Sequence, residues 1–276
     1  MKAMVCLLAL IVTLAGCGGI KTLDQIILRP SHELTLLPSD YGYAYDVVEL
    51  VAPSGATISA WHVKSDSPRG IVVIVPGSDA NKSLYCEALP LLVPYGYDVL
   101  LFDYEGFGES SGDVHLQAVI DDAFVVTDYA KSTGMRVVLF GVSIGTPAVA
   151  RVAADRDLAG CIFEGTLILD REIELYLAME GYPPVAPIAN LWVGPQIPPD
   201  YDIMKYIQLV SEPKHFQHSS EDDVTPYDGA LMVYDLAPEP KDFWTMYGGH
   251  GKMIRLATDE YAERIRAFLS QVLPGG

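Results

Sequence analysis

The chain has 276 residues, half of them hydrophobic, and carries 36 acidic against 18 basic residues, a net charge of −18. Such a surface repels phosphate backbones and anionic lipid headgroups, which excludes nucleic acid as an expected partner and a basic patch as the means of binding a membrane. The length allows one large domain or two small ones.

The N-terminus predicts a targeting segment. Lys2 precedes the apolar run VCLLALIVTLAG, which is too short to span a membrane and has the length of a secretory signal core. The run ends in LAGC at residues 14–17, which resembles the lipobox of bacterial lipoproteins. We therefore predict a signal peptide at residues 1–16 and lipidation of Cys17; the alternatives are an ordinary signal peptide cleaved elsewhere and an uncleaved anchor.

Lipidation would also predict a location. Without residues 1–16 the chain keeps 17 basic and 36 acidic residues, so acyl chains on Cys17 would have to supply the membrane affinity. Gly18, with no aspartate after the cysteine, resembles lipoproteins sent to the outer membrane. The expected location is the cell envelope, anchored on the periplasmic side of the outer membrane.

Strand and helix patterns alternate through the first two thirds of the chain. Strand patterns at 43–51 and 57–63 flank APSGA, which has hairpin-turn chemistry. Near-continuous apolar runs, typical of strands buried on both faces, follow at 70–77, 97–104, 136–142 and 158–165, with helical patterns at 81–93, 113–132 and 143–154. This alternation predicts an α/β fold with a mostly parallel central sheet, an N-terminal antiparallel hairpin and helices on both faces.

The pattern loosens after Glu164. An amphipathic helix pattern at 167–182 precedes a segment with six prolines between Pro183 and Pro199, which predicts a stiff cover, and we expect a possible short cap at 166–212. Tyr182 and Trp192 there are candidates for a pocket floor, or ordinary core and rim residues. A strand at 212–219, a helix at 227–236, a strand at 241–247 and a helix at 253–273 complete the chain.

Cysteine placement predicts two separate thiols. Cys6 would leave with the signal peptide and Cys17 would carry lipid, which leaves Cys86 in a helical pattern and Cys161 in a strand pattern. An oxidising compartment would permit a disulfide between them, but two separately buried thiols are the expectation.

The stretch GVSIG places Ser143 where a strand pattern ends and a helix pattern begins. Gly141 and Gly145 allow a tight turn, and the helix N-terminus adds positive potential at the serine. A nucleophilic serine needs a base within hydrogen-bond reach and donors for the developing oxyanion. The alternative is a glycine-lined turn with an incidental serine.

Two later strands end in the partners that such a serine needs. The strand at 212–219 leads to Asp222 and Asp223, and the strand at 241–247 leads to His250. The order serine, aspartate, histidine is that of the α/β-hydrolase arrangement. Glu164, at the end of another strand, is the substitute carboxylate if neither aspartate serves His250.

Three segments resemble α/β-hydrolase-fold serine hydrolases. FDYEGFGESSG (102–112) is similar to the family's loop after the fourth strand, HSSEDDVTP (218–226) to its H-G-x-x-D-x-x-V-P segment, and YGGHG (247–251) to its histidine loop. The resemblance implies a triad of Ser143, Asp222 and His250, a structural role for Asp103, and no cofactor or metal. Here Pro76 stands where the family has a histidine, and Ser219 replaces its glycine.

The oxyanion donors in that family are backbone amides. Gly77 and Ser78 can still present one despite Pro76, and we assign the amides of Ser78 and Ile144 as the pair.

The other histidines carry no site pattern. His215 and His218 are three residues apart on a strand, point to opposite faces and cannot share a metal ion. For His32, His62 and His115 we expect surface or loop roles.

The sequence thus predicts a signal peptide at 1–16, a lipidated lead-in at 17–40 and one α/β-hydrolase domain at 41–276. The expected activity is that of a carboxylesterase-like serine hydrolase that cleaves a carboxylic ester or related acyl bond of a small or lipid-like substrate through an acyl-enzyme. The alternatives are a thioesterase or peptidase on the same triad, and a catalytically silent envelope-binding lipoprotein.

Overall fold

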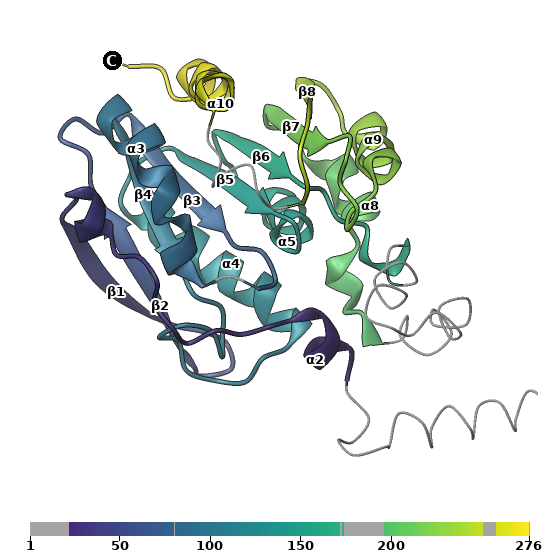
Figure 1. The fold of residues 1–276 in the computed structure, drawn as a ribbon, viewed down its shortest axis with the longest axis horizontal. Coiled ribbons are helices and arrows are strands. Elements are labelled where there is room, and N and C mark those ends of the chain that lie inside the picture. Colours follow the sequence, from purple (N-terminus) through teal and green to yellow (C-terminus); the bar gives the residue numbers. More distant parts are fainter. Residues whose placement is uncertain (1–21, 80, 172, 174–195, 251–257, 276) are drawn as a thin grey trace, which may run out of the picture.

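The computed structural model describes residues 22–79, 81–171, 173, 196–250 and 258–275. Its centre is an eight-stranded sheet in the order β1-β2-β4-β3-β5-β6-β7-β8 (Figure 1). β2 runs antiparallel to both β1 and β4, and every later pair is parallel, which confirms the predicted sheet with its N-terminal hairpin. The strands are β1 (Tyr45–Val51), β2 (Thr57–Val63), β3 (Gly70–Val75), β4 (Tyr97–Phe102), β5 (Val137–Val142), β6 (Gly160–Glu164), β7 (Lys214–Ser219) and β8 (Lys241–Met246).

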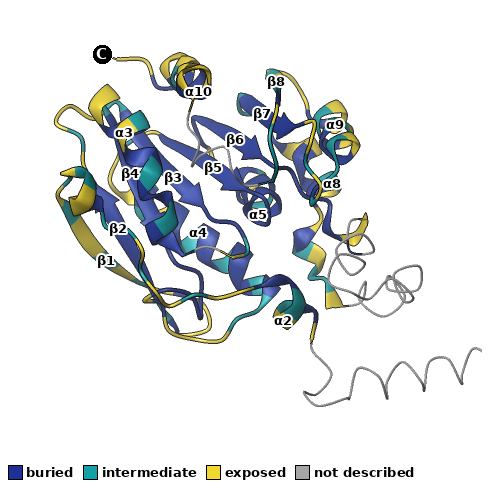
Figure 2. Cartoon of the chain, viewed as in Figure 1, coloured by how far each residue is buried: buried dark blue, intermediate teal, exposed yellow. Residues whose placement is uncertain are grey.

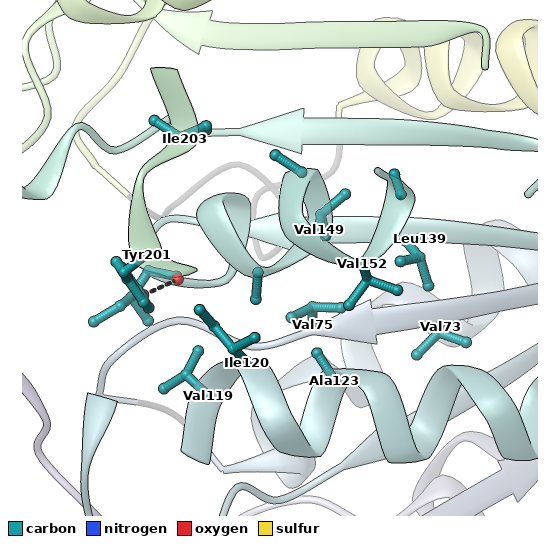
Figure 3. Close-up of a cluster of buried hydrophobic side chains, with 14 of the residues drawn as sticks. Val73, Val75, Val119, Ile120, Ala123, Leu139, Val149, Val152, Tyr201 and Ile203 are labelled. Atoms are coloured by element: carbon teal, nitrogen blue, oxygen red, sulfur yellow. Dashed lines mark hydrogen bonds between the residues drawn. The ribbon is translucent and has the colours of Figure 1, made fainter. Parts of the chain in front are cut away.

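Helices cover both faces of this sheet, as predicted. Side chains alternate along the buried strands, so Val73 faces one apolar cluster while Val72 and Ile74 face the other. Figure 2 shows the central strands fully buried between the two layers, and Figure 3 shows Val73 and Val75 of β3 against side chains of α4 and α5. One layer holds α4 (Leu116–Ser132), α5 (Gly145–Ala153) and α9 (Tyr227–Leu236); the other holds α3 (Leu89–Leu92) and α10 (Asp259–Val272).

The helix predicted at 81–93 is not one regular helix. The chain instead forms a 3₁₀ helix η2 (Lys82–Ala88), the short α3 and a second 3₁₀ turn η3 (Val93–Tyr95). Pro90 and Pro94 lack the amide hydrogen that a continuous α-helix would need at those positions, so the helix breaks into pieces.

Two other helices begin later than predicted. α4 starts at Leu116 because His115 is its N-cap, with Nδ1 accepting the amide of Ala118 at 3.0 Å. α5 starts at Gly145, two residues after Ser143, so the serine itself lies in the turn.

Some predictions lie outside the described residues. They are the signal peptide, Cys17, most of the helix at 167–182, Tyr182, Trp192 and residues 253–257 of the last helix. Of the expected cover, the structure describes residues 166–171, 173 and 196–212, which include η5 (Pro199–Tyr201), α8 (Ile203–Tyr206) and η6 (Ile207–Leu209). The helices that are described are all too short or too polar to cross a bilayer.

The two remaining cysteines are buried and unbonded, as predicted. Burial raises the pKa of the Cys86 thiol to about 12 and also raises the pKa of Cys161. Neither thiol is a ready nucleophile, since the reactive form of cysteine is the thiolate.

A buried ion pair ties the loop after β3 to the loop after β4. Asp103 is fully buried and accepts hydrogen bonds from the ammonium group and the amide of Lys82, the latter at 2.7 Å, and from the amide of Glu109 at 2.9 Å. Asp103 therefore has the structural role that the sequence predicts. The pair holds the start of η2 against the loop after β4.

The buried carboxyl group of Asp122 in α4 should make the free energy of unfolding depend on pH. It is fully buried, its Oδ2 accepts the amide of Glu105 at 2.8 Å, and its Oδ1 has no partner among the described residues. Burial raises its pKa to about 8, so the folded chain keeps a proton that the unfolded chain releases above pH 4. The free energy of unfolding should therefore fall as the pH rises from about 4 to 8. Asp122 should account for about 2 kcal/mol of this loss between pH 6 and 8.

We therefore expect Asp122→Asn to remove this loss. In urea unfolding at several pH values, the free-energy curve of the variant should rise relative to that of the wild-type chain between pH 6 and 8. Parallel curves over that range would show that Asp122 does not hold its proton in the folded chain.

Candidate active site

Ser143 lies in a sharp turn between β5 and α5. Its φ is +51°, the one positive φ among the non-glycine residues that the structure describes. Glycines make this turn possible, because a Cβ on Gly145 would lie 2.4 Å from the carbonyl oxygen of Val75, and one on Gly141 would lie 2.7 Å from the side chain of Val149. The turn raises the serine above the carboxyl ends of the parallel strands, at the N-terminus of α5.

Three side chains from separate loops meet at this turn. His250 Nε2 lies 2.9 Å from Ser143 Oγ, and His250 Nδ1 lies 2.8 Å from Asp222 Oδ2. The Ser143 residue is 8% exposed, while the side chains of His250 and Asp222 are 17% and 3% exposed. The structure thus brings together the three residues that the sequence named, in an order that can relay a proton from the serine.

Asp222 is fixed by its own loop as well as by His250. Its Oδ1 accepts the amides of Val224 and Thr225 at 3.0 and 2.8 Å, and its Oδ2 accepts the Thr225 hydroxyl at 2.9 Å. Burial raises the pKa of Asp222, but the hydrogen bond and charge of His250 and the Thr225 amide lower it by more, so the carboxylate stays ionised. The neighbouring Asp223 is exposed to solvent.

Glu164, the alternative carboxylate, has other partners. Its Oε2 accepts the Tyr261 hydroxyl at 2.7 Å and a hydrogen bond from the Gln217 amide group. Both partners are buried, which links the end of β6 to β7 and α10. Asp222, rather than Glu164, is the carboxylate that contacts His250.

The amides of the two predicted oxyanion donors differ from the Gly77 amide in their hydrogen bonding. The Gly77 amide donates to the Tyr85 hydroxyl at 2.7 Å, so the expectation that Gly77 can present an oxyanion donor is wrong. Within the described part of the chain, the amides of Ser78 and Ile144 donate to no protein acceptor. Ile144 follows Ser143 directly, and Gly77, the residue before Ser78, also lies beside it, since a Cβ on Gly77 would lie 3.8 Å from the Ser143 Cβ.

His218 and Thr225 support the loop that carries Asp222, a role that the sequence analysis missed. The buried His218 accepts the Thr166 amide on Nδ1 at 3.2 Å and donates from Nε2 to the Thr225 carbonyl at 2.8 Å. Burial lowers the pKa of His218, which keeps the ring neutral and able to do both. The family-like segment 218–226 contained the signal, since its first residue is this histidine.

The other polar clusters do not form a metal centre. His215 pairs with Asp242 at 2.7 Å and stacks on Phe268, away from His218. The expectation of a surface or loop role is wrong for His62, which is buried in β2 between Asp98 and Tyr129. His32 contacts the Gly108 carbonyl. Among the described residues, no group of three or more histidine, cysteine, aspartate or glutamate side chains is arranged to hold a metal ion.

Gly165 offers a test of how tightly the imidazole of His250 is placed. The residue has a φ of +61°, and a Cβ there would lie 3.2 Å from His250 Cε1. Gly165→Ala should displace the ring and lower ester turnover by about 10- to 100-fold, because small misplacements of a catalytic group are costly. Gly134→Ala is the matched control, since Gly134 has a φ of +80° and open space around it.

Both glycine variants should lose similar stability from left-handed backbone strain, about 1 kcal/mol in urea unfolding. Only Gly165→Ala should lose turnover. Equal turnover in the two variants would mean that His250 tolerates a shift of its ring.

Comparison with known proteins agrees with this fold. Residues 66–204, about half of the chain, match the family described as serine aminopeptidase S33. The chain belongs to this family. It is 28% identical to the uncharacterized protein YfhR of Escherichia coli K12 over 212 residues, which are 72% of this chain and 70% of that protein. It is 27% identical to human alpha/beta hydrolase domain-containing protein 17C over 183 residues, 64% of this chain and 50% of that protein.

Solved structures give the same fold. The Pyrococcus furiosus esterase Pf2001 superimposes with a TM-score of 0.75 over 90% of this chain and 98% of that chain, at 19% identity. The predicted α/β-hydrolase fold is confirmed, and this member of the S33 family is a hydrolase.

Proposed function

We propose that this S33-family hydrolase is a serine hydrolase that cleaves a carboxylic ester or related acyl bond, with Ser143, His250 and Asp222 as its catalytic triad. The observation that carries the proposal is the pair of hydrogen bonds from Ser143 through His250 to Asp222, at 2.9 and 2.8 Å. A fold used only for binding has no physical need for all three groups in this relay.

The relay supplies each proton transfer that acyl hydrolysis needs. Ser143 Oγ attacks the substrate carbonyl carbon while its proton moves to His250 Nε2, and His250 then gives that proton to the leaving group. In the second half of the reaction, His250 Nε2 takes a proton from the water that attacks the acyl carbon, and returns it to Ser143 Oγ as the acyl–serine bond breaks. The ionised Asp222 holds the ring with Nδ1 protonated and stabilises the imidazolium as it forms.

The amides of Ser78 and Ile144 would stabilise the oxyanion. Neither amide donates to a protein acceptor among the described residues. Ile144 follows Ser143 directly, and Ser78 follows Gly77, which lies beside Ser143. Pre-oriented amides of this kind are worth several kcal/mol in acyl-transfer transition states, because their dipoles need no reorganisation. Neither a metal nor a cofactor enters these steps.

The leaving group separates the candidate activities. The structural neighbour from P. furiosus is named an esterase, whereas the family is described as aminopeptidases, and the same triad serves both bonds. We expect residues 18–276 to hydrolyse p-nitrophenyl butyrate with burst kinetics and to cleave an aminoacyl p-nitroanilide far more slowly. Faster cleavage of the anilide would assign a peptidase, and no turnover of any ester, thioester or anilide would favour a binding protein.

We also propose that the hydrolase domain at 41–276 is held at a membrane through a lipid on Cys17, after removal of residues 1–16. The lipobox-like LAGC carries this proposal. The substrate would then be a small or lipid-like acyl compound of the cell envelope. The acidic chain makes a nucleic-acid partner unfavourable.

Cys17→Ser should release the protein from membranes. The net negative charge of the chain repels anionic lipid headgroups, so nearly all membrane affinity should depend on the lipid. Fractionation of a Gram-negative host that expresses each full-length form measures this. Equal membrane retention of the variant would identify residues 1–16 as an uncleaved anchor instead.

A further inference from the structure

Two buried tyrosines hold one peptide plane of the loop that carries Ser78. The Tyr104 hydroxyl donates to the Pro76 carbonyl at 2.9 Å, and the Gly77 amide donates to the Tyr85 hydroxyl at 2.7 Å. This carbonyl and this amide belong to the same planar peptide unit and point in opposite directions. The plane between Pro76 and Gly77 is therefore fixed from both sides.

The neighbouring peptide unit carries the Ser78 amide. Its orientation relative to the fixed plane depends only on the two backbone dihedrals of Gly77. On the far side, the Ser78 carbonyl accepts the Arg29 amide at 2.8 Å. Ser78 is thus held before and after its own amide, and among the described residues that amide donates to no protein acceptor.

The second donor is held in a similar way. The Ser143 carbonyl, in the same peptide unit as the Ile144 amide, accepts the amide and hydroxyl of Thr146 at 2.9 and 2.7 Å. The following carbonyl, that of Ile144, accepts the Tyr201 hydroxyl (Figure 3). Tyr201 comes from η5, so a segment far along the chain fixes the turn beside the nucleophile.

The tyrosine rings and their hydroxyl groups have separate roles. The Tyr104 ring packs edge-on against Phe102 and Phe107, at centroid distances of 5.2 and 5.9 Å, and phenylalanine would fill that space equally well. Burial raises the pKa of Tyr104 well above its usual value, and Tyr201 and Tyr85 raise it further; burial also raises the pKa of Tyr201. The hydroxyls therefore stay protonated and able to donate.

We propose that Tyr85, Tyr104 and Tyr201 are positioning residues that orient the Ser78 and Ile144 amides toward the oxyanion. The inference rests on the proposed serine-hydrolase function. None of the three touches the reacting atoms; each acts through a backbone group beside an oxyanion donor. Their hydroxyls should matter to the transition state and hardly at all to the bound substrate.

Single Tyr→Phe variants at 85, 104 and 201 test this, with Tyr206→Phe as the matched control. Tyr206 is also buried, but its hydroxyl donates to Asp200 at 2.7 Å, on the outside of the same segment. Two ligands would be compared: a trifluoromethyl ketone, to which Ser143 Oγ adds while its proton moves to His250 and the ketone oxygen becomes an oxyanion, and the matching methyl ketone, which stays largely unreacted.

For each of the three variants we expect kcat on p-nitrophenyl butyrate to fall about tenfold with KM within about twofold. The Ki of the trifluoromethyl ketone should rise by about the same factor, while the Ki of the methyl ketone and all constants of Tyr206→Phe stay at wild-type values. A merely structural role would leave the ratio of the two Ki values unchanged, and that result would overturn the proposal.

The wild-type chain separates this failure from failure of the proposed function. If it forms no adduct with the trifluoromethyl ketone and hydrolyses no ester, the serine-hydrolase assignment is rejected and the tyrosine inference with it. If it does both and the variants keep the wild-type ratio of Ki values, only the tyrosine inference is rejected.

Discussion

Ser143→Ala is expected to lower ester turnover by about 10⁴- to 10⁶-fold. Removal of the nucleophile from a triad removes the covalent route altogether, and the residual rate comes from the oxyanion site and substrate binding alone. The variant should fold normally, because the side chain fills little volume and, among the described residues, its hydroxyl hydrogen-bonds to His250 alone. Steady-state kinetics on p-nitrophenyl butyrate measures the loss, and the thermal transition should move by no more than a few degrees.

Ser132→Ala is a suitable control for this result. Ser132 ends α4, and its hydroxyl donates to the Tyr129 carbonyl at 2.7 Å on the surface, remote from the carboxyl ends of the parallel strands. Its turnover should equal that of the wild-type chain. Turnover within about tenfold of wild type in Ser143→Ala would remove the serine from the mechanism.

Asp222→Asn should have the second largest effect, a loss of about 10³- to 10⁴-fold in kcat. The amide nitrogen of asparagine cannot accept a hydrogen bond from His250 Nδ1, so the imidazole adopts the tautomer with its proton on Nε2. That tautomer cannot take the proton of Ser143. The fold should survive, because an asparagine oxygen can still accept the Val224 and Thr225 amides that now bind Oδ1.

The neighbouring carboxylate is the control for charge. Asp223→Asn removes one negative charge from the residue next to Asp222, whose neighbour Asp223 has an exposed side chain. We expect this variant to lose less than about tenfold in turnover. A larger loss in Asp223→Asn than in Asp222→Asn would transfer the role of the acid. Near-full activity in both variants would return Glu164 to consideration, even though its carboxylate binds Tyr261 and Gln217 here.

The strands and the order of the three candidate residues could be predicted because they depend on local patterns. A strand buried on both faces must be apolar throughout, so runs such as GIVVIV and VVLFGV are visible without knowledge of their neighbours. In a parallel sheet, the carboxyl ends of the strands share one edge, and Ser143, Asp222 and His250 each follow such an end. The sequence alone therefore indicated that these side chains meet.

The contacts across the site could not be predicted in the same way. The hydroxyls of Tyr85, Tyr104 and Tyr201 reach the site from three separate segments, and sixteen tyrosines in the chain offer no pattern that singles these out. The hydrogen bond from the Gly77 amide to the Tyr85 hydroxyl joins residues only eight apart, yet no periodic pattern of side chains predicts it. Pro90 was visible in the sequence, yet the apolar spacing around it still favoured a regular helix over the 3₁₀ turns that form.

Every step of the proposed mechanism depends on Ser143 being the nucleophile. Incubation of residues 18–276 with a fluorophosphonate probe, followed by digestion and mass spectrometry, locates the covalent adduct. We predict one adduct per chain, on the peptide that contains Ser143, and none in Ser143→Ala or after prior reaction with a trifluoromethyl ketone. An adduct on any other residue, or none on the folded wild-type chain, would contradict the assignment.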